Sequence, residues 1–150
     1  MEKILVATDG SETAGRAVDR AAELAKATGA KLYILTVESE RIFPLEKINE
    51  LVQAKGDVPI MMDTPAMLDE FCKQAAANAE ARARVLGAPA IESEVLWGDA
   101  AETILETARS EGVDTIVLGR RGHGRLAGLL VGSVSHKVVS LSPCTVIVVP

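Results

Sequence analysis

Short apolar runs alternate along this chain with longer stretches in which apolar residues recur every three or four positions. The short runs are rich in Ile, Leu and Val, which is typical of strands that are buried on both faces of a parallel sheet. These runs predict five strands, at Lys3–Thr8, Lys31–Val37, Ile91–Trp97, Thr115–Leu118 and Thr145–Val149.

The longer stretches have the spacing of amphipathic helices. The first has Ser11 as its expected N-cap and Gly29 as its C-terminal stop. In the third, Asp99 is followed three residues later by Glu102, which is the spacing of a capping box. The pattern predicts helices at Glu12–Thr28, at Ala66–Leu86, from the cap at Asp99 to about Glu111, and from Gly132–Ser133 to just before Ser142.

The segment Glu38–Pro65 is long for a connection inside a compact domain. Within it, Leu45, Ile48, Leu51 and Val52 have the spacing of one short amphipathic helix. We treat the segment as a variable excursion that can be mobile, within a single domain that spans residues 1–150, since this length is typical of one domain.

Strand and helix follow each other four times before the last strand, which predicts an α/β fold: an open, parallel, five-stranded sheet with helices on both faces. In such sheets, ligands bind beyond the carboxyl ends of the strands, beside the point where the strand order switches. The segments to inspect are therefore those that follow strands, namely Ala7–Gly10, the residues from Val37 onward, Gly98–Asp99 and the loop after Leu118.

The formal net charge of −5 is an average over two unlike parts of the chain. Residues 1–114 hold all 21 acidic residues and 12 basic ones, whereas residues 115–150 hold four basic residues and no acid. An acidic protein repels nucleic acid and anionic lipid, so neither partner is expected. The acid-free end indicates a local anion site, and the alternative of chance combined with a buried strand stays open.

Other classes of protein are excluded by what the chain lacks. No apolar run approaches the ~18 residues of a membrane span, and the chain opens without the basic and apolar pattern of a signal peptide. Cys72 and Cys144 are far apart, without a CxxC pattern or a nearby histidine cluster. We therefore expect a cytoplasmic, reduced protein without a structural zinc site.

The fourth predicted strand runs into a glycine-rich loop that has the features of a phosphate site. Glycines allow backbone N–H groups to approach an anion, and a helix that begins at Ser133 directs its unpaired N–H groups to the same place. Ser133 and Ser135 add hydroxyl groups, and the loop carries three positive charges. These are Arg120, Arg121 and Arg125. The alternatives are an ordinary solvated loop and a Ser133 that serves only as an N-cap.

Two other nucleotide motifs fit less well. The P-loop pattern GxxxxGK[ST] is absent from the chain. Residues Gly122–Ala127 match GxGxxA, but that dinucleotide motif needs an acidic residue about 20 positions further on, and no acid follows Asp114.

With these features in place, the chain resembles the ATP-binding subgroup of the universal stress protein family. The signature G-x2-G-x9-G-[ST] is complete, and the opening Thr8–Ser11, the Gly98–Asp99 turn and the closing Pro143–Val149 also fit. The signature residues are Gly119, Gly122, Gly132 and Ser133. The resemblance covers essentially the whole chain except Glu38–Pro65, where family members vary.

The resemblance implies a Rossmann-like, adenine nucleotide α-hydrolase-like sheet in strand order 3-2-1-4-5 that binds ATP or another adenine nucleotide. It also implies a homodimer joined through Thr145–Val149. Carried over by position, Ala7, Thr8 and Asp9 lie under the nucleotide, and Val37 offers backbone groups to the adenine. The residues that meet the ribose and phosphates are Leu118, Gly119, Arg121, Gly122, Gly132, Ser133, Val134 and Ser135.

We expect a stress-response regulatory protein that binds ATP with little or slow hydrolysis, because no nucleophile, base and orienting group stand together in the sequence. Asp9 is the candidate to hold Mg²⁺ or Mn²⁺, indirectly through the phosphates. One alternative is a Mg-dependent ATPase or phosphotransferase that uses Asp9. The other is a dimeric interaction module that binds no nucleotide.

Overall fold

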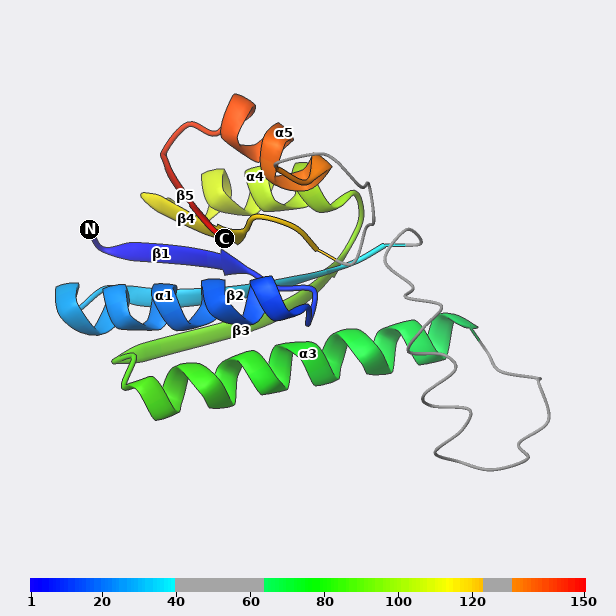
Figure 1. Ribbon diagram of the computed structural model, residues 1–150, viewed down its shortest axis with the longest axis horizontal. Coiled ribbons are helices and arrows are strands. Elements are labelled where there is room, and N and C mark those ends of the chain that lie inside the picture. Colours follow the sequence, from blue (N-terminus) through cyan, green and yellow to red (C-terminus); the bar gives the residue numbers. More distant parts are fainter. Residues whose placement is uncertain (40–63, 123–130) are drawn as a thin grey trace.

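The computed structural model describes residues 1–39, 64–122 and 131–150. All five predicted strands and all four predicted helices are present, with ends that shift by at most two residues (Figure 1). The elements are β1 (Lys3–Ala7), α1 (Glu12–Thr28), β2 (Lys31–Glu38), α3 (Thr64–Leu86), β3 (Ala90–Trp97), α4 (Ala100–Ser110), β4 (Thr115–Gly119), α5 (Ser133–Leu141) and β5 (Thr145–Val149). The short helix predicted around Leu45–Val52 lies outside the described residues.

The five strands form one parallel sheet in the order β3-β2-β1-β4-β5, which confirms the predicted order. In the centre of the sheet, Val6 of β1 is in register with Ile34 of β2 on one side and with Val117 of β4 on the other. The chain therefore reverses its direction across the sheet between β1 and β4. At this switch the two connections leave in opposite directions and open a crevice at the carboxyl edge.

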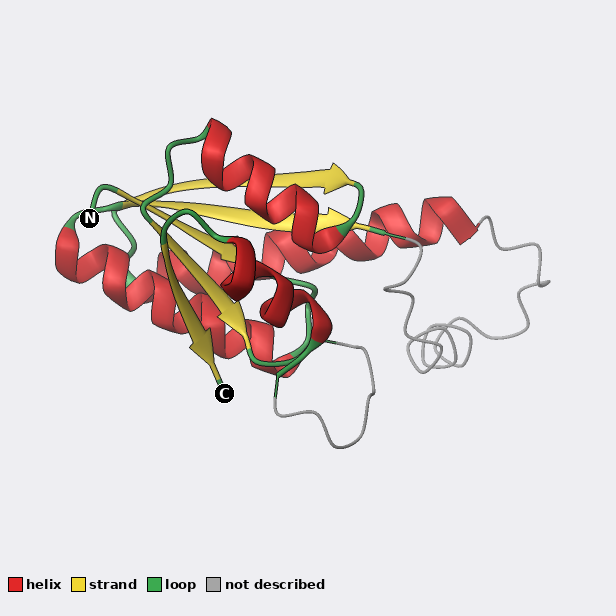
Figure 2. Cartoon of the chain, turned by 90° about the horizontal axis from the view of Figure 1, so that it is seen from above, coloured by secondary structure: helices red, strands yellow, loops and turns green. Residues whose placement is uncertain are grey.

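Helices cover both faces of the sheet, as predicted. Helices α1 and α3 pack on one face, and α4 and α5 pack on the other (Figures 1 and 2). Alternate residues of β2 serve the two layers: Ile34 packs with α1 and α3, whereas Leu35 packs with α4 and α5. Double-sided burial of this kind explains why the central strands read as unbroken apolar runs rather than alternating ones.

The helix ends follow the caps predicted from the sequence. Ser11 Oγ accepts a hydrogen bond from the N–H of Ala14, and Gly29 ends α1 in the left-handed conformation at φ 73°. Asp99 caps α4 by accepting from the N–H of Glu102 at 3.1 Å. None of the helices in the described ranges is both long enough and apolar enough to cross a membrane.

One buried hydroxyl group in the sheet lacks a hydrogen-bond partner among the described residues. Thr36 of β2 is 1% exposed and its Oγ1 is unpaired. Thr115 of β4 is equally buried, but its Oγ1 donates to Asp114 Oδ1 at 3.0 Å. An unpaired buried hydroxyl loses its hydration without compensation, so Thr36 lowers the stability of the sheet.

We predict that Thr36→Val raises the free energy of unfolding by about 1 kcal/mol, because valine keeps the β-branched shape and removes the unpaired hydroxyl. Urea unfolding with an unchanged m-value measures the effect. Thr115→Val is the matched control and should give no gain, since it removes a hydroxyl that is paired. A loss of stability in Thr36→Val would contradict this account.

Candidate functional site

A cavity with a volume of about 370 Å³ opens at the carboxyl edge of the sheet, at the switch between β1 and β4. This volume lies within the usual range of small-molecule sites. All of the binding residues named from the sequence line it, namely Ala7, Thr8, Asp9, Val37, Leu118, Gly119, Arg121, Gly122, Gly132, Ser133, Val134 and Ser135. The fold thus brings these residues together from three strands, one helix and the loops that adjoin them.

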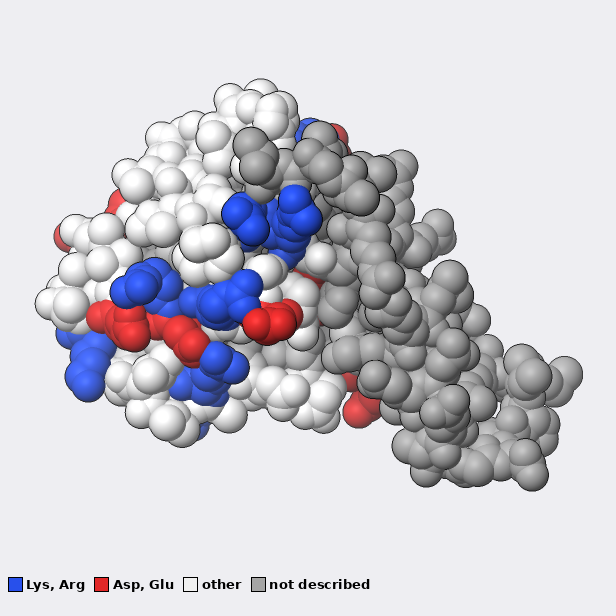
Figure 3. Space-filling view, in the orientation of Figure 1, with Lys and Arg blue, Asp and Glu red and all other residues white. Residues whose placement is uncertain are grey.

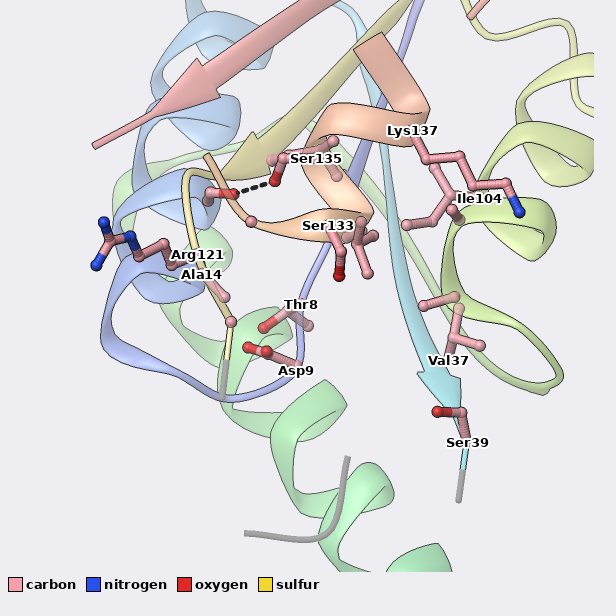
Figure 4. Close-up of a pocket in the computed structure, with 18 of the residues that line it drawn as sticks. Thr8, Asp9, Ala14, Val37, Ser39, Ile104, Arg121, Ser133, Ser135 and Lys137 are labelled. Carbon is pink, nitrogen blue, oxygen red and sulfur yellow. Dashed lines mark hydrogen bonds between the residues drawn. The ribbon is translucent and has the colours of Figure 1, made fainter. Parts of the chain in front are cut away.

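The cavity has two chemically different ends. Thr8, Asp9 and Ser133 lie together at one end, and Val37, Ser39 and Ile104 lie at the other (Figure 4). Val37 and Ile104 belong to the buried apolar cluster between the sheet and α4, so the second end is lined by apolar side chains. The first end presents hydroxyls, one carboxylate and backbone groups.

Three helices direct their N-termini toward the cavity, because helices in a parallel α/β fold begin where strands end. Ala14 of α1, Ala100 of α4 and Ser133 of α5 all line it. The side chains of Ser11 and Asp99 cap the first two helices. The N-cap of helix α5 is Gly132, which has no side chain to cap the helix. Its first N–H groups therefore lack an acceptor within the helix, as in anion-binding helix ends.

Ser133 is the first helical residue rather than the N-cap, which excludes the alternative that Ser133 serves only as a cap. Its side chain is exposed at the polar end of the cavity. The reason is that Gly132 already takes the extended cap conformation, with φ −67° and ψ 160°. The Ser133 hydroxyl therefore points where a ligand would lie.

Ser135 has a different environment. It is buried, and its hydroxyl donates to the carbonyl oxygen of Gly119 at 2.8 Å (Figure 4). This bond ties the first turn of α5 to the end of β4. What Ser135 offers the cavity in this arrangement is its backbone N–H rather than the hydroxyl proton expected from the sequence.

The two glycines after β4 are required by contacts with the β1–α1 turn. A Cβ at Gly119 would lie 2.8 Å from the carbonyl carbon of Thr13 and 2.9 Å from the nitrogen of Ala14. A Cβ at Gly122 would lie 2.2 Å from Asp9 Oδ2. From the sequence, these glycines were expected to let a phosphate approach. In the structure, backbone atoms already exclude a side chain at Gly119, and the Asp9 carboxylate excludes one at Gly122.

Further hydrogen bonds fasten this turn and both arms of the glycine loop. Thr13 Oγ1 donates to the carbonyl of Arg121, and Asp9 Oδ1 accepts from the N–H of Ser11 at 2.9 Å. The N–H of Gly132 donates to the carbonyl of Arg120 at 2.8 Å, and the N–H of Arg120 donates to Val149 at 2.7 Å. The start of α5 is thereby connected through the backbone of one residue, Arg120, to the end of β5.

The basic side chains of the acid-free segment do not converge on the polar end. Arg121 lines the cavity, but its guanidinium group points away from Thr8, Asp9 and Ser133 (Figure 4). Arg120 is exposed, and Arg125 lies outside the described residues. The hydrogen-bond donors that the described residues present at this end are therefore chiefly backbone N–H groups and hydroxyls.

The charge asymmetry along the chain is not repeated on the face of the molecule that carries α1. Acidic and basic side chains are interspersed there (Figure 3). Arg16 pairs with Glu12 at 2.6 Å, and Arg20 pairs with Glu23 at 2.9 Å. On this face, acidic side chains of α1 therefore offset neighbouring basic ones.

Lys137 lines the cavity and was missed in the sequence analysis. It lies one helical turn after Ser133, and this i, i+4 spacing was the signal that both side chains share a face of α5. Its Nζ lies 3.1 Å from Glu102 Oε1 and 3.7 Å from Asp99 Oδ1. The hydrogen bond to Glu102 raises the pKa of Lys137, so the ammonium group stays charged.

The other cavity residues that the sequence did not indicate are apolar. Their positions follow from the tertiary packing of α1, α4 and β2 rather than from a motif. They are Ala14, Leu35, Ala100, Ala101 and Ile104. Ser39 and Asp99, which also line the cavity, lie in segments that were expected at this edge.

The cavity is poorly equipped for covalent chemistry. No histidine or cysteine is among the described residues that line it. Cys72 is buried on α3, and burial raises the pKa of its thiol to about 11. The described residues contain no group of three or more metal-ligating side chains, so Asp9 alone does not make a metal site.

Comparison with known proteins agrees with this architecture. Residues 1–150 match the family model described as "Universal stress protein family". The universal stress protein YxiE of Bacillus subtilis is 34% identical over 149 residues, covering 98% of this chain and 97% of the relative. A universal stress protein of Thermus aquaticus is 37% identical over 150 residues, covering 97% and 96%.

The fold is also shared with a solved universal stress protein structure in complex with cAMP. That protein is 31% identical, and the match covers 99% of this chain and 95% of the other, with a TM-score of 0.68. The two proteins therefore share the parallel-sheet fold.

We predict that Gly119→Ala destabilises the protein by about 1–3 kcal/mol, because the added methyl group would force apart the backbones of β4 and α1. Thermal or urea unfolding measures the loss. Gly15→Ala is the matched control: its Cβ would meet only the flexible end of Arg82, at 3.5 Å, so the helix propensity of alanine should stabilise it. Equal stability of the two variants would contradict the proposed backbone contact.

Proposed function

The chain belongs to the universal stress protein family, and we propose that it binds an adenine nucleotide in the cavity at the β1–β4 switch. The observation that carries the proposal is the uncapped N-terminus of α5, which opens into a cavity whose opposite end is apolar. We infer ATP as the physiological ligand and a regulatory role in stress response, with little or slow hydrolysis.

The apolar end suits a nucleobase. Buried apolar surface is supplied there by Leu35, Val37, Ala101 and Ile104. The edge of a base bound against them would face the backbone that follows β2. Flat, apolar walls with a few polar groups at the rim are typical of sites for small aromatic ligands. The cAMP complex of a relative that is 31% identical supports an adenine nucleotide as the ligand class.

The polar end suits phosphate. The first N–H groups of α5 and the exposed Ser133 hydroxyl are donors without a side-chain cap to compete for them. A helix N-terminus also carries partial positive charge, which stabilises an anion there. The nucleotide would therefore lie with its base toward α4 and its phosphates toward α5.

Asp9 makes the binding of a polyphosphate depend on a cation. Its carboxylate lies against Gly122 at the polar end, where it would repel a phosphate. One carboxylate together with phosphate oxygens is a usual way to hold Mg²⁺ or Mn²⁺, so the residues fit a cation that the nucleotide brings with it. Such a cation would neutralise charge between Asp9 and the phosphates.

Slow hydrolysis follows from the scarcity of bases at this end. A water molecule that attacks a phosphate needs a group positioned to orient it or to take its proton. Asp9 is the carboxylate at the polar end, and its Oδ1 is already occupied by the N–H of Ser11. Binding rather than turnover is the activity that this arrangement favours.

We also propose that the chain forms a homodimer through β5, because the two edges of the sheet differ in chemistry. The β3 edge carries Glu92 and Glu94, and charges on an edge strand prevent pairing with another chain. The β5 edge, Thr145–Val149, has no charged residue. A second copy would satisfy the open edge by symmetric pairing.

The ligand is tested by mass spectrometry of small molecules released from freshly purified, denatured protein, and by titration with AMP and ATP. We expect an adenine nucleotide to be released or bound, and Mg²⁺ to strengthen the binding of ATP more than that of AMP. Absence of any release, together with no binding in titration, would overturn the proposal.

Gly122→Val should lower nucleotide affinity by about tenfold or more, because the new side chain would displace the Asp9 carboxylate into the polar end. Circular dichroism confirms that the variant is folded. Gly15→Ala, a glycine change away from the cavity, is the control and should bind as the wild type does. Unchanged affinity in folded Gly122→Val would contradict the proposed phosphate position.

For the dimer, Val148→Lys should produce a monomer in light scattering at micromolar concentration. Val148 is half-buried on β5 and lies outside both described core clusters, so the charge acts on the edge rather than on the core. Val85→Lys, at an exposed valine of α3, is the matched control and should leave the mass unchanged. A monomeric wild-type protein would rule out the dimer.

A further inference from the structure

Lys137 reaches across the side of the cavity from α5 to α4. It extends from the helix that carries Ser133 toward Ile104, away from Thr8 and Asp9 (Figure 4). Its ammonium group approaches the two acidic side chains at the start of α4, at 3.1 Å from Glu102 and 3.7 Å from Asp99. One of the four positive charges of the acid-free segment is therefore paired with acids of the preceding segment.

The partners of Lys137 are themselves held in place. Asp99 Oδ1 accepts the N–H of Glu102 as the cap of α4, so this carboxylate has a defined position at the helix start. Both acids lie at a helix N-terminus, where the dipole stabilises negative charge. Lys137 thus contacts a defined point on the wall that carries Ala100 and Ala101 of the cavity.

Polar contacts hold helix α5 in addition to its apolar packing. Val138 is fully buried, and Val134 packs against the apolar cluster between the sheet and α4. The hydroxyl of Ser135 fastens the first turn of α5 to β4, on the side of the glycine loop. Lys137 adds a fastening on the side of α4, and these contacts together orient the open end of α5.

We propose that Lys137 is a positioning residue of the nucleotide site, which ties the second turn of α5 to the first turn of α4. The tie sets the separation between the wall that receives the base and the helix end that receives the phosphates. This inference rests on the proposed function. The rival is that Lys137 leaves its acids and contacts the ligand phosphates directly.

The two roles predict different results for Lys137→Met. Loss of a partly exposed ion pair weakens an interaction by about two- to fivefold, so AMP and ATP should both lose affinity by that factor. Exchanging the charges in the double variant Lys137→Glu with Glu102→Lys should restore the affinity for both nucleotides. Lys73→Met, which breaks the ion pair of Lys73 with Asp69 on α3, is the control and should have no effect.

Isothermal titration with AMP and with Mg²⁺–ATP measures these affinities. A loss for ATP much larger than that for AMP, without recovery in the charge exchange, would assign Lys137 to the phosphates and overturn the proposal. Unchanged affinity of Lys137→Met for both nucleotides would also overturn it.

A second readout does not need a ligand. Amide hydrogen exchange of His136, whose N–H donates to the carbonyl of Gly132 at 2.9 Å, should be about two- to fivefold faster in free Lys137→Met and normal in the charge exchange. If the wild-type protein binds neither nucleotide, the proposed function fails, while faster exchange still supports the tie. Unchanged exchange in Lys137→Met would overturn the tie itself.

Discussion

The first turn of α1 and the last residue of β4 are in backbone contact, and the arrangement of the cavity depends on that contact. Because Gly119 has no side chain, its Cα approaches the peptide between Thr13 and Ala14 more closely than any other residue would allow. The same approach brings Asp9 against Gly122 and the hydroxyl of Thr13 onto the carbonyl of Arg121. The protein's own contacts therefore position Gly119–Gly122, the described start of the glycine loop, without a ligand.

The donors at the polar end of the cavity come from backbone geometry more than from charged side chains. Three helix N-termini reach the cavity because the sheet is parallel, yet the side chains of Ser11 and Asp99 cap two of them. The third helix has Gly132 as its N-cap and stays open. Arg121 points away, and Lys137 is paired with Glu102, so neither contributes a free positive charge to the polar end. Such a site can hold a small anion on an acidic protein that repels large ones.

Most of the fold could be predicted from the sequence, because local signals and the global architecture agree. Alternation of apolar runs with amphipathic helices allows few arrangements other than a parallel sheet, and caps such as Ser11 and Asp99 mark helix starts directly. The residues that line the polar end of the cavity could also be named from the sequence, because the signature of spaced glycines and the family resemblance indicate them without a structure. The order of the strands came from the resemblance to a family rather than from the pattern.

The elements, their order along the chain and the residues at the carboxyl edge follow from the amino-acid sequence alone, because they depend on local periodicity and on backbone conformations that only certain residues adopt. What each of those residues touches is known only from the folded structure. It showed that Gly119 serves a backbone contact, that Ser135 bonds to Gly119, and that Lys137 joins α4 to α5. These contacts link residues that are distant in sequence, and no local pattern encodes which partner a side chain meets after the chain has folded.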